Sequence, residues 1–257
     1  MRLRSWEDVQ LAKRNKEIDL SEGAMKSIWI LGAGKFGLKA AKTMRRKNSR
    51  TEITIIEKKS EICNQIEKLD FKTVCMDGIE YLDQNLKGID YPDWIIPAIP
   101  VHVAYEWVRL KIKGSYILKT ILVPEGVIMS LPNVFKGKRC EIYMSIADFI
   151  CPDNCPEPKD LCTHTGKPRP FTLYKKLESI KYDHFRSVVV RSRQLSPGVG
   201  GYSPGALFNA LDVIKSSTIP VLLSTACRCH GVMHAFKQVS TGTAAARDQG
   251  NQHSRKL

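Results

Sequence analysis

The pattern of apolar and polar positions between residues 27 and 59 predicts a strand, a helix and a second strand. The first apolar run, Ser27 to Leu31, is short and contains β-branched residues, which is typical of a buried parallel strand. From Lys35 to Lys47 the apolar residues recur at helical spacing, and a second apolar run extends from Ile53 to Ile56. This order predicts a βαβ unit at the start of an α/β domain.

The turn between the first strand and the helix carries the glycine pattern of a dinucleotide site. It reads G-x-G-x-x-G, a pattern in which the glycines permit a tight turn, close approach of the backbone to a pyrophosphate and close packing of helix on strand. An acid, Glu57, ends the second strand twenty residues after Gly37, where it can accept hydrogen bonds from the adenosine ribose. We therefore expect NAD(H) to bind here, and the alternative is a glycine-tolerant turn in an ordinary α/β domain. The expected cofactor-binding residues are Gly32, Gly34, Lys35, Phe36, Gly37 and Glu57, with Lys58 beside the acid.

Later apolar runs continue the α/β pattern. Helices are expected over Ser60 to Leu69, before Leu86, and over Gly205 to Ser216. Strands are expected at Phe71 to Cys75, Trp94 to Pro97, Tyr116 to Val123, Val127 to Leu131, Glu141 to Ile146, Ser187 to Arg191 and Pro220 to Ser224. The fold class that follows is α/β, a Rossmann-like parallel sheet with a cysteine-bearing α/β C-terminal extension.

Residues 27 to 108 resemble the TrkA-N (RCK-type) family of NAD(P)-binding Rossmann domains. Besides the glycine pattern and Glu57, the resemblance rests on Asp77 after the third strand and on the segment Tyr91-Pro92-Asp93-Trp94-Ile95-Ile96. The chain departs from the family at Met76, where a glycine is usual, and at Pro97-Ala98-Ile99-Pro100, which replaces Ala-Thr. The resemblance implies that Asp77, Gly78 and Pro97 also lie at the cofactor.

Four regions are expected along the chain. Residues 1–24 form an N-terminal arm or precede the true start at Met25, and residues 25–150 form the dinucleotide-binding domain. Residues 151–239 form the cysteine-rich extension, and residues 240–257, which are small, polar and unpatterned, form a disordered tail.

Five of the eight cysteines fall in two clusters that suggest a metal site. Three of them occur within twelve residues, separated by prolines, and the others stand in a Cys-Arg-Cys-His run. Soft thiolate ligands favour zinc or an iron–sulfur cluster, although the spacing matches neither a zinc finger nor a common ferredoxin. The alternatives are redox-active thiols and incidental cysteines, and Cys63 and Cys75 are expected to be core residues. The expected ligands are Cys151, Cys155, Cys162, Cys227, Cys229 and His230.

The formal charge of +14 narrows the range of partners. Most of the basic excess lies after residue 108, where no nucleic-acid-binding motif is present, so a small anionic ligand or substrate is expected and nucleic acid is not. The glycine-rich segment Ser196 to Gly205, with Arg191 and Arg193, is a candidate for that anion. The apolar, uncharged run Trp94 to Tyr105 is too short to span a membrane, and the first twenty residues lack a secretory leader, which predicts a cytoplasmic protein.

Two functions fit these features. The first is an NAD(H)-dependent redox protein, an oxidoreductase that acts on a small anionic substrate with the cysteine-bound metal, with His102, His164 or His230 as proton donor. The second, which the TrkA-N resemblance implies, is a non-enzymatic nucleotide sensor resembling the regulators of potassium transport, with a homodimer or a membrane transporter as partner.

Overall fold

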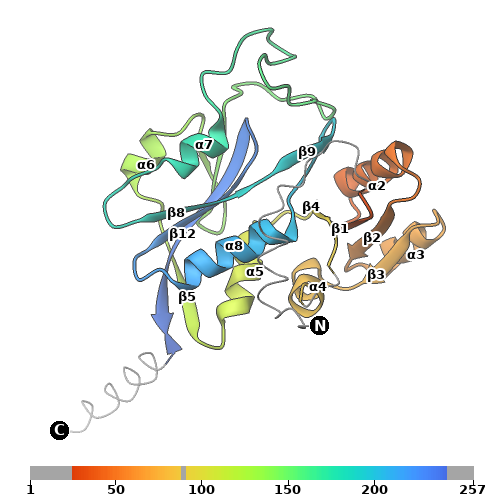
Figure 1. Ribbon diagram of the computed structural model, residues 1–257, viewed down its shortest axis with the longest axis horizontal. Helices are drawn as coiled ribbons and strands as arrows, with labels where there is room; N and C mark the ends of the chain where they lie inside the picture. The colour runs from red at the N-terminus through yellow and green to blue at the C-terminus, as the bar shows by residue number, and fades with distance from the viewer. Residues whose placement is uncertain (1–24, 88–90, 242–257) are drawn as a thin grey trace, which may run out of the picture. The chain divides into compact units, whose positions relative to one another are not determined.

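The computed structural model describes residues 25–87 and 91–241, and it divides the chain into two compact units (Figure 1). Unit 1 comprises residues 1–100, 152–156 and 191–212, and unit 2 comprises residues 101–151, 157–190 and 213–257. The N-terminal arm expected over residues 1–24 and nearly all of the expected tail lie outside the described residues.

Unit 1 is organised around a four-stranded sheet in the order β3-β2-β1-β4. The strands are β1 (Ser27–Leu31), β2 (Glu52–Glu57), β3 (Lys72–Cys75) and β4 (Trp94–Pro97), and every neighbouring pair is parallel. Leu31, the last residue of β1, pairs with Ile56 on one side and with Pro97 on the other. Parallel strands buried on both faces need apolar residues throughout, which is why β2 reads EITIIE with only Glu52 exposed.

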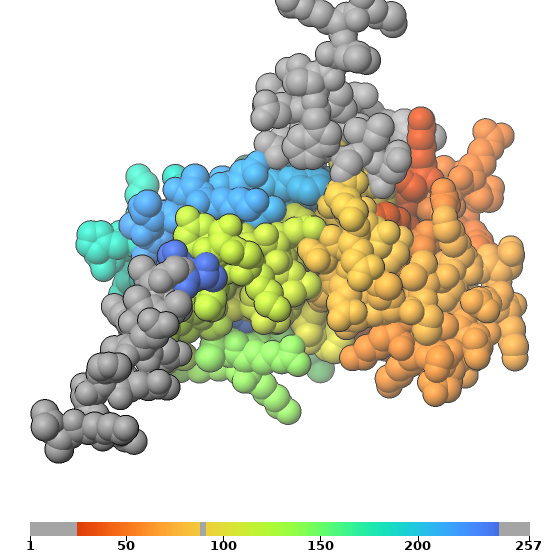
Figure 2. All heavy atoms as spheres, turned by 90° about the horizontal axis from the view of Figure 1, so that it is seen from below, coloured from red at the N-terminus to blue at the C-terminus, as the bar shows by residue number. Residues whose placement is uncertain are grey.

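The helices of unit 1 connect consecutive strands. They are α2 (Lys35–Lys47), α3 (Ser60–Glu67) and α4 (Gly78–Asn85). Helix α2 buries Gly37, Ala40, Ala41 and Met44, small or flexible residues at helical spacing. In the space-filling view, the chain from β1 to β4, coloured red to yellow, forms one closely packed mass (Figure 2). The Rossmann-like parallel sheet predicted from the sequence is confirmed.

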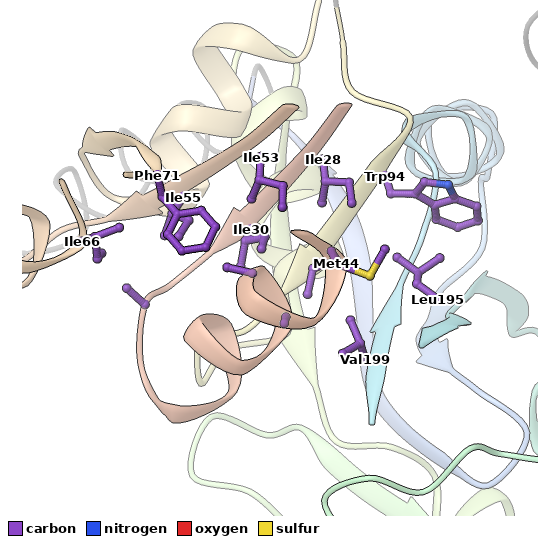
Figure 3. Close-up of a cluster of buried hydrophobic side chains, with 14 residues drawn as sticks. Ile28, Ile30, Met44, Ile53, Ile55, Ile66, Phe71, Trp94, Leu195 and Val199 are labelled. Carbon is purple, nitrogen blue, oxygen red and sulfur yellow. The ribbon is translucent and has the colours of Figure 1, made fainter. Parts of the chain in front are cut away.

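A distant hairpin completes the core of unit 1. It consists of β9 (Arg193–Ser196) and β10 (Val199–Gly201), which pair antiparallel, and the following Tyr202 exchanges two backbone hydrogen bonds with Ile95 of β4. The side chains of Leu195 and Val199 join the cluster of Met44 and Trp94 (Figure 3). Part of the expected C-terminal extension therefore belongs to unit 1.

Unit 2 is built on a sheet in the order β6-β7-β12-β11-β8, with β5 also paired to β12. The 11-residue strand β12 (His230–Ser240) pairs antiparallel with β11 (Val221–Ala226) over its first half, with β7 (Ile142–Ser145) at its start and with β5 (Tyr116–Ile121) at its end. The remaining strands are β6 (Phe135–Lys136) and β8 (Arg186–Arg191). The single strand β12 thus pairs with three other strands.

The helices of unit 2 include α5 (Val103–Ile112), α6 (Glu125–Met129) and α7 (Leu173–Glu178). The strand expected over Val127 to Leu131 was wrong, because this segment holds the end of α6 and a turn. The apolar run is too short to distinguish the two periodicities, and only Val127 and Leu131 are buried, four residues apart as on a helix face. Helix α8 (Pro204–Lys215) has its first nine residues in unit 1 and its last three in unit 2.

The division into units differs from the boundary expected at residue 150. Residues 101–150 group with the later chain because β5 and β7 pair with β12, which lies near the C-terminus. Among the described residues no helix is long and apolar enough to cross a membrane.

Candidate dinucleotide-binding site

The glycine turn after β1 has the geometry that the glycine pattern predicts. Gly32 has φ +93°, a left-handed conformation that side chains disfavour, and a Cβ there would lie 2.7 Å from Ile99 Cγ2. A Cβ on Gly37 would lie 2.0 Å from the carbonyl oxygen of Gly32, so the helix can approach the turn only through glycine. In contrast, a Cβ on Gly34 would meet nothing within 4 Å, which leaves open space over the turn.

The N-terminus of α2 presents unpaired backbone donors beside that open space. Gly34 is the N-cap residue, no side chain caps the helix, and the first turn contains no acidic residue. The first backbone bond of the helix runs from Leu38 N–H to Gly34 carbonyl, 3.0 Å, so the preceding N–H groups are free of intrahelical partners. Together with the positive end of the helix dipole, these donors favour a phosphate group.

Glu57 lies next to the turn at the end of β2. Its side chain is buried, and its carboxylate accepts hydrogen bonds from Ala33 N–H at 2.9 Å and from Lys59 N–H at 3.0 Å. The acid is therefore fixed in place by the glycine turn itself, as a ribose-binding acid needs to be. The neighbouring Lys58 is exposed.

The residues implied by the family resemblance lie at the ends of β3 and β4. Asp77 is the N-cap of α4, and its Oδ1 accepts from Ile79 N–H at 2.8 Å and from Glu80 N–H at 3.4 Å. Gly78 packs closely, since a Cβ there would lie 3.4 Å from both Leu31 and Ile99. Capping of α4 is thus the role that the geometry of Asp77 displays directly.

A hollow opens where the sheet order reverses between β1 and β4. Its volume is about 370 Å³, and all of its lining residues are apolar or glycine: Phe36, Ala40, Ile96, Pro97, Ala98, Ile99, Pro100, Gly198, Val199 and Gly200. The crevice at such a reversal is where open α/β sheets bind ligands. Phe36 and Pro97, both expected at the cofactor, lie here. Gly198, Val199 and Gly200, which the sequence analysis assigned to a candidate anion-binding loop, form one wall of the hollow.

A short segment contacts Lys35 and Lys39 of α2. This strap, which we define as residues 152–156, places the Asp153 carboxylate 2.7 Å from Lys35 Nζ, while the Asp153 carbonyl accepts a hydrogen bond from Lys39 Nζ. The hydrogen bond from Lys35 holds the pKa of the Asp153 carboxyl below its ordinary value. Cys155 anchors the strap, because its carbonyl accepts from Gly198 N–H at 2.9 Å and from Gln194 Nε2 at 2.6 Å. No sequence pattern distinguished Asp153 or Lys39 in advance.

The expected metal ligands are distributed over both units. Cys155 belongs to unit 1, whereas Cys151, Cys162, Cys227, Cys229 and His230 belong to unit 2. Over residues 25–87 and 91–241, no three side chains of His, Cys, Asp or Glu form a group that could hold a metal ion. The structure therefore does not bring the expected set together.

Three of these cysteines nevertheless have distinctive surroundings within unit 2. Cys227 Sγ accepts from Cys229 N–H at 3.4 Å and His230 N–H at 3.3 Å, and burial followed by the charge of Glu157 raises the Cys227 pKa to about 12. Hydrogen bonds from the backbone and hydroxyl of Thr165 lower the pKa of Cys162. Cys229 Sγ accepts from Arg169 Nε at 2.8 Å.

The histidines considered as proton donors lie in unit 2. The ring of His164 stacks on Phe149 with centroids 4.2 Å apart, and burial lowers the pKa of His230. His102 is buried, with its Nδ1 3.0 Å from Nδ1 of His234 and its Nε2 3.0 Å from Thr225 Oγ1. Sequence reasoning missed His234, since the two histidines are far apart along the chain.

Comparisons with known protein families divide the chain near residue 105, close to the boundary between unit 1 and unit 2 at residues 100 and 101. A family model for the TrkA-N domain matches residues 28–106, and a model described as "Uncharacterized protein, C-terminal domain" matches residues 104–239. The chain is 29% identical over 226 residues to an uncharacterized protein of Archaeoglobus fulgidus, a match that covers 81% of this chain and 98% of the relative. No solved structure matches the chain at a significant level. The TrkA-N resemblance inferred from the sequence is confirmed.

Proposed function

The chain belongs to the family described as "Uncharacterized protein, C-terminal domain" and carries a TrkA-N domain, and we propose that it binds NAD(H) in unit 1 and responds to the bound nucleotide. The observation that carries this proposal is the open space above Gly34 at an uncapped helix N-terminus, with the buried acid Glu57 on the next strand. A pyrophosphate requires the first feature and an adenosine ribose the second.

The charges around the turn suit a dinucleotide. Lys35 and Lys39 lie on the first turns of α2, and no acidic side chain occurs in the first turn to repel a phosphate. The adjacent hollow of about 370 Å³ has apolar and glycine walls that suit the flat ring at the other end of the cofactor.

The strap supports a response to binding as well as binding itself. Asp153 forms its ion pair with Lys35, and a bound phosphate would compete with that carboxylate for the same ammonium group. Both ends of the strap continue directly into unit 2, at Cys151 and at Glu157. Displacement of the strap by nucleotide would therefore pull on the chain of the other unit, which is the behaviour of a nucleotide sensor.

The second candidate is an NAD(H)-dependent redox protein acting on a small anionic substrate. The basic composition of the later chain and the hollow beside the glycine turn favour it. Hydride transfer would belong to the cofactor, and the chain would orient it. The residues that line the hollow offer no titratable side chain for proton transfer, so the sensor is the function that the geometry supports better.

A cysteine-bound zinc ion or iron–sulfur cluster stays a prediction, and no step of the proposed function depends on it. Elemental analysis and an absorption spectrum of anaerobically purified protein test it directly. Stoichiometric zinc or a brown chromophore that Cys162→Ser or Cys227→Ser removes would support it, and metal-free, colourless protein would dismiss it.

The proposed function is tested by binding and by turnover on the same preparation. We expect NADH to bind stoichiometrically. We also expect hydrogen exchange to become faster on binding at Cys155 N–H, which donates to the Pro152 carbonyl, and at Gly198 N–H, which donates to the Cys155 carbonyl, because the strap is released. Unchanged exchange in a nucleotide-saturated chain would contradict the response. Steady oxidation of NADH with a panel of small acids, aldehydes or imines would favour the redox candidate.

A further inference from the structure

Two cysteines lie together beside Glu57 in unit 1, apart from the clusters expected to bind metal. Cys63 is on α3 and is buried, whereas Cys75 is the last residue of β3 and is exposed. Their sulfur atoms are 2.7 Å apart. A disulfide bond is about 2.0 Å long, so the two sulfurs need to move by less than the length of a bond to become joined.

Glu57 holds this pair in position through its backbone. The thiol of Cys63 donates a hydrogen bond to the Glu57 carbonyl at 3.1 Å, and Cys75 is the residue paired with Glu57 between β2 and β3. Met76 N–H, next to Cys75, donates to the same carbonyl at 3.0 Å. The pairing of β3 with β2 therefore fixes the position of Cys75, the start of α3 fixes that of Cys63, and both thiols lie beside the Glu57 backbone.

We propose that Cys63 and Cys75 are a redox-active dithiol that closes to an intrachain disulfide beside Glu57. A small-molecule disulfide, such as oxidised glutathione, is the oxidant. The Cys75 thiolate attacks one sulfur of the oxidant, forms a mixed disulfide and releases one thiolate. The sulfur of Cys63 then attacks Cys75, the second thiolate leaves, and the two protons lost by the cysteines are taken up by the two released thiolates.

The order of attack follows from the surroundings of the two thiols. Cys75 is exposed and meets the oxidant first. Cys63 is buried, and burial followed by its contact with Cys75 raises its pKa to about 12, so it reacts only with a partner already beside it. The same burial keeps the Cys63 sulfur from attacking an external disulfide.

The disulfide would affect nucleotide binding, a consequence that rests on the proposed function. It would tie the first turns of α3, which follow Lys58 and Lys59, to the end of β3, which precedes Asp77. The hydrogen bond from Cys63 to the Glu57 carbonyl would be lost, and the two loops that flank the acid would be drawn together. We expect the oxidised chain to bind NADH at least threefold more weakly than the reduced chain.

Peptide mapping tests the disulfide without any nucleotide. The full folded chain is incubated with oxidised glutathione, the remaining thiols are alkylated and the digest is analysed by mass spectrometry. We expect a peptide joining Cys63 to Cys75, its absence in Cys75→Ser, and its presence in the control Cys140→Ser, which removes another exposed cysteine. Closing a loop of this length is expected to raise the Tm by roughly 6–12 °C in the wild type and in Cys140→Ser only.

The outcomes separate the two proposals. Recovery of Cys63 and Cys75 as alkylated thiols, or of Cys75 joined only to glutathione, would overturn the dithiol. A joined peptide with equal NADH affinities in the two states would overturn the coupling to the nucleotide. A joined peptide in a chain that binds no NADH would leave the dithiol standing and reject the proposed function.

Discussion

The Asp153 carboxylate lies 2.7 Å from Lys35 Nζ, where it neutralises a lysine at the start of the helix that follows the glycine turn. The two side chains are largely exposed, and they come from segments separated by more than a hundred residues. The acid thus competes from within the chain for a cation that a phosphate would use.

Removal of that competition should strengthen nucleotide binding. We expect Asp153→Asn to bind NADH about two- to fivefold more tightly than the wild type, a modest change because exposed ion pairs are weak in water. Asp160→Asn is the matched control, since it changes the net charge by the same amount. Asp160 is also exposed, and it lies in unit 2. Titration calorimetry of both variants measures the effect, and equal affinities would show that the strap does not compete.

Glu57 should make the site prefer NAD over NADP. The 2′-phosphate of NADP would lie against a carboxylate that is already buried and fixed by Ala33 and Lys59 N–H groups, so repulsion should weaken NADP by at least about tenfold. Glu57→Gln should reduce this preference, whereas Glu61→Gln on α3 should retain it. A wild type that binds both nucleotides equally would remove Glu57 from the proposed ribose contact.

Gly37→Ala should destabilise the fold, because its Cβ would lie 2.0 Å from a backbone oxygen of the glycine turn. Overpacking of this kind costs about 1–3 kcal/mol of the free energy of unfolding. Gly34→Ala serves as the control, since its Cβ would meet nothing within 4 Å. Urea denaturation of the two variants measures the difference, and equal midpoints would contradict the close approach of α2 to the turn.

The buried histidine pair of unit 2 should make stability depend on pH. Burial lowers the pKa of both His102 and His234, and the charges of Glu141 and Glu106, with a hydrogen bond to the Arg139 backbone, oppose the shift only at His234. The unfolded chain binds protons at both residues below about pH 6.5, while the folded chain does not. Stability is therefore expected to fall as the pH drops from about 6.5 toward the lower folded pKa values.

The size of this effect is measurable by thermal denaturation between pH 7.5 and 5. The Tm should stay constant above about pH 6.5, and below it each histidine should lower the Tm by at most roughly 3–6 °C per pH unit. His234→Asn should flatten the dependence, and His184→Asn, at an exposed position, should leave it unchanged. Parallel curves for the wild type and His234→Asn would show that the pair does not remain neutral in the fold.

The local features of unit 1 were predictable from the sequence because they depend on neighbouring residues. The buried strand β1, the turn at Gly32 and the acid at the end of β2 all follow from short patterns. The hairpin that places Leu195 and Val199 in the same core carries no such signal, since its glycine-rich sequence also suits a loop. Its place depends on the pairing of Tyr202 with Ile95, a contact between distant segments.

The cysteines show the same limit. Spacing along the chain suggested that Cys151, Cys155 and Cys162 bind one metal ion together. Cys155 instead belongs to unit 1, where its carbonyl accepts a hydrogen bond from Gln194 in the β9–β10 hairpin. Cys63 and Cys75 were expected to be core residues, and Cys63 is buried as expected, but Cys75 is exposed. The two sulfurs lie close together because β3 pairs with β2, and the number of residues between Cys63 and Cys75 does not reveal that pairing.

The most direct test of the central claim is titration of NADH into the wild type and Gly34→Val. The valine side chain would enter the open space above the turn, so the variant should fold with an unchanged Tm and lose NADH binding. A Gly34→Val chain that folds and binds NADH with wild-type affinity would contradict the assignment of the dinucleotide to this turn.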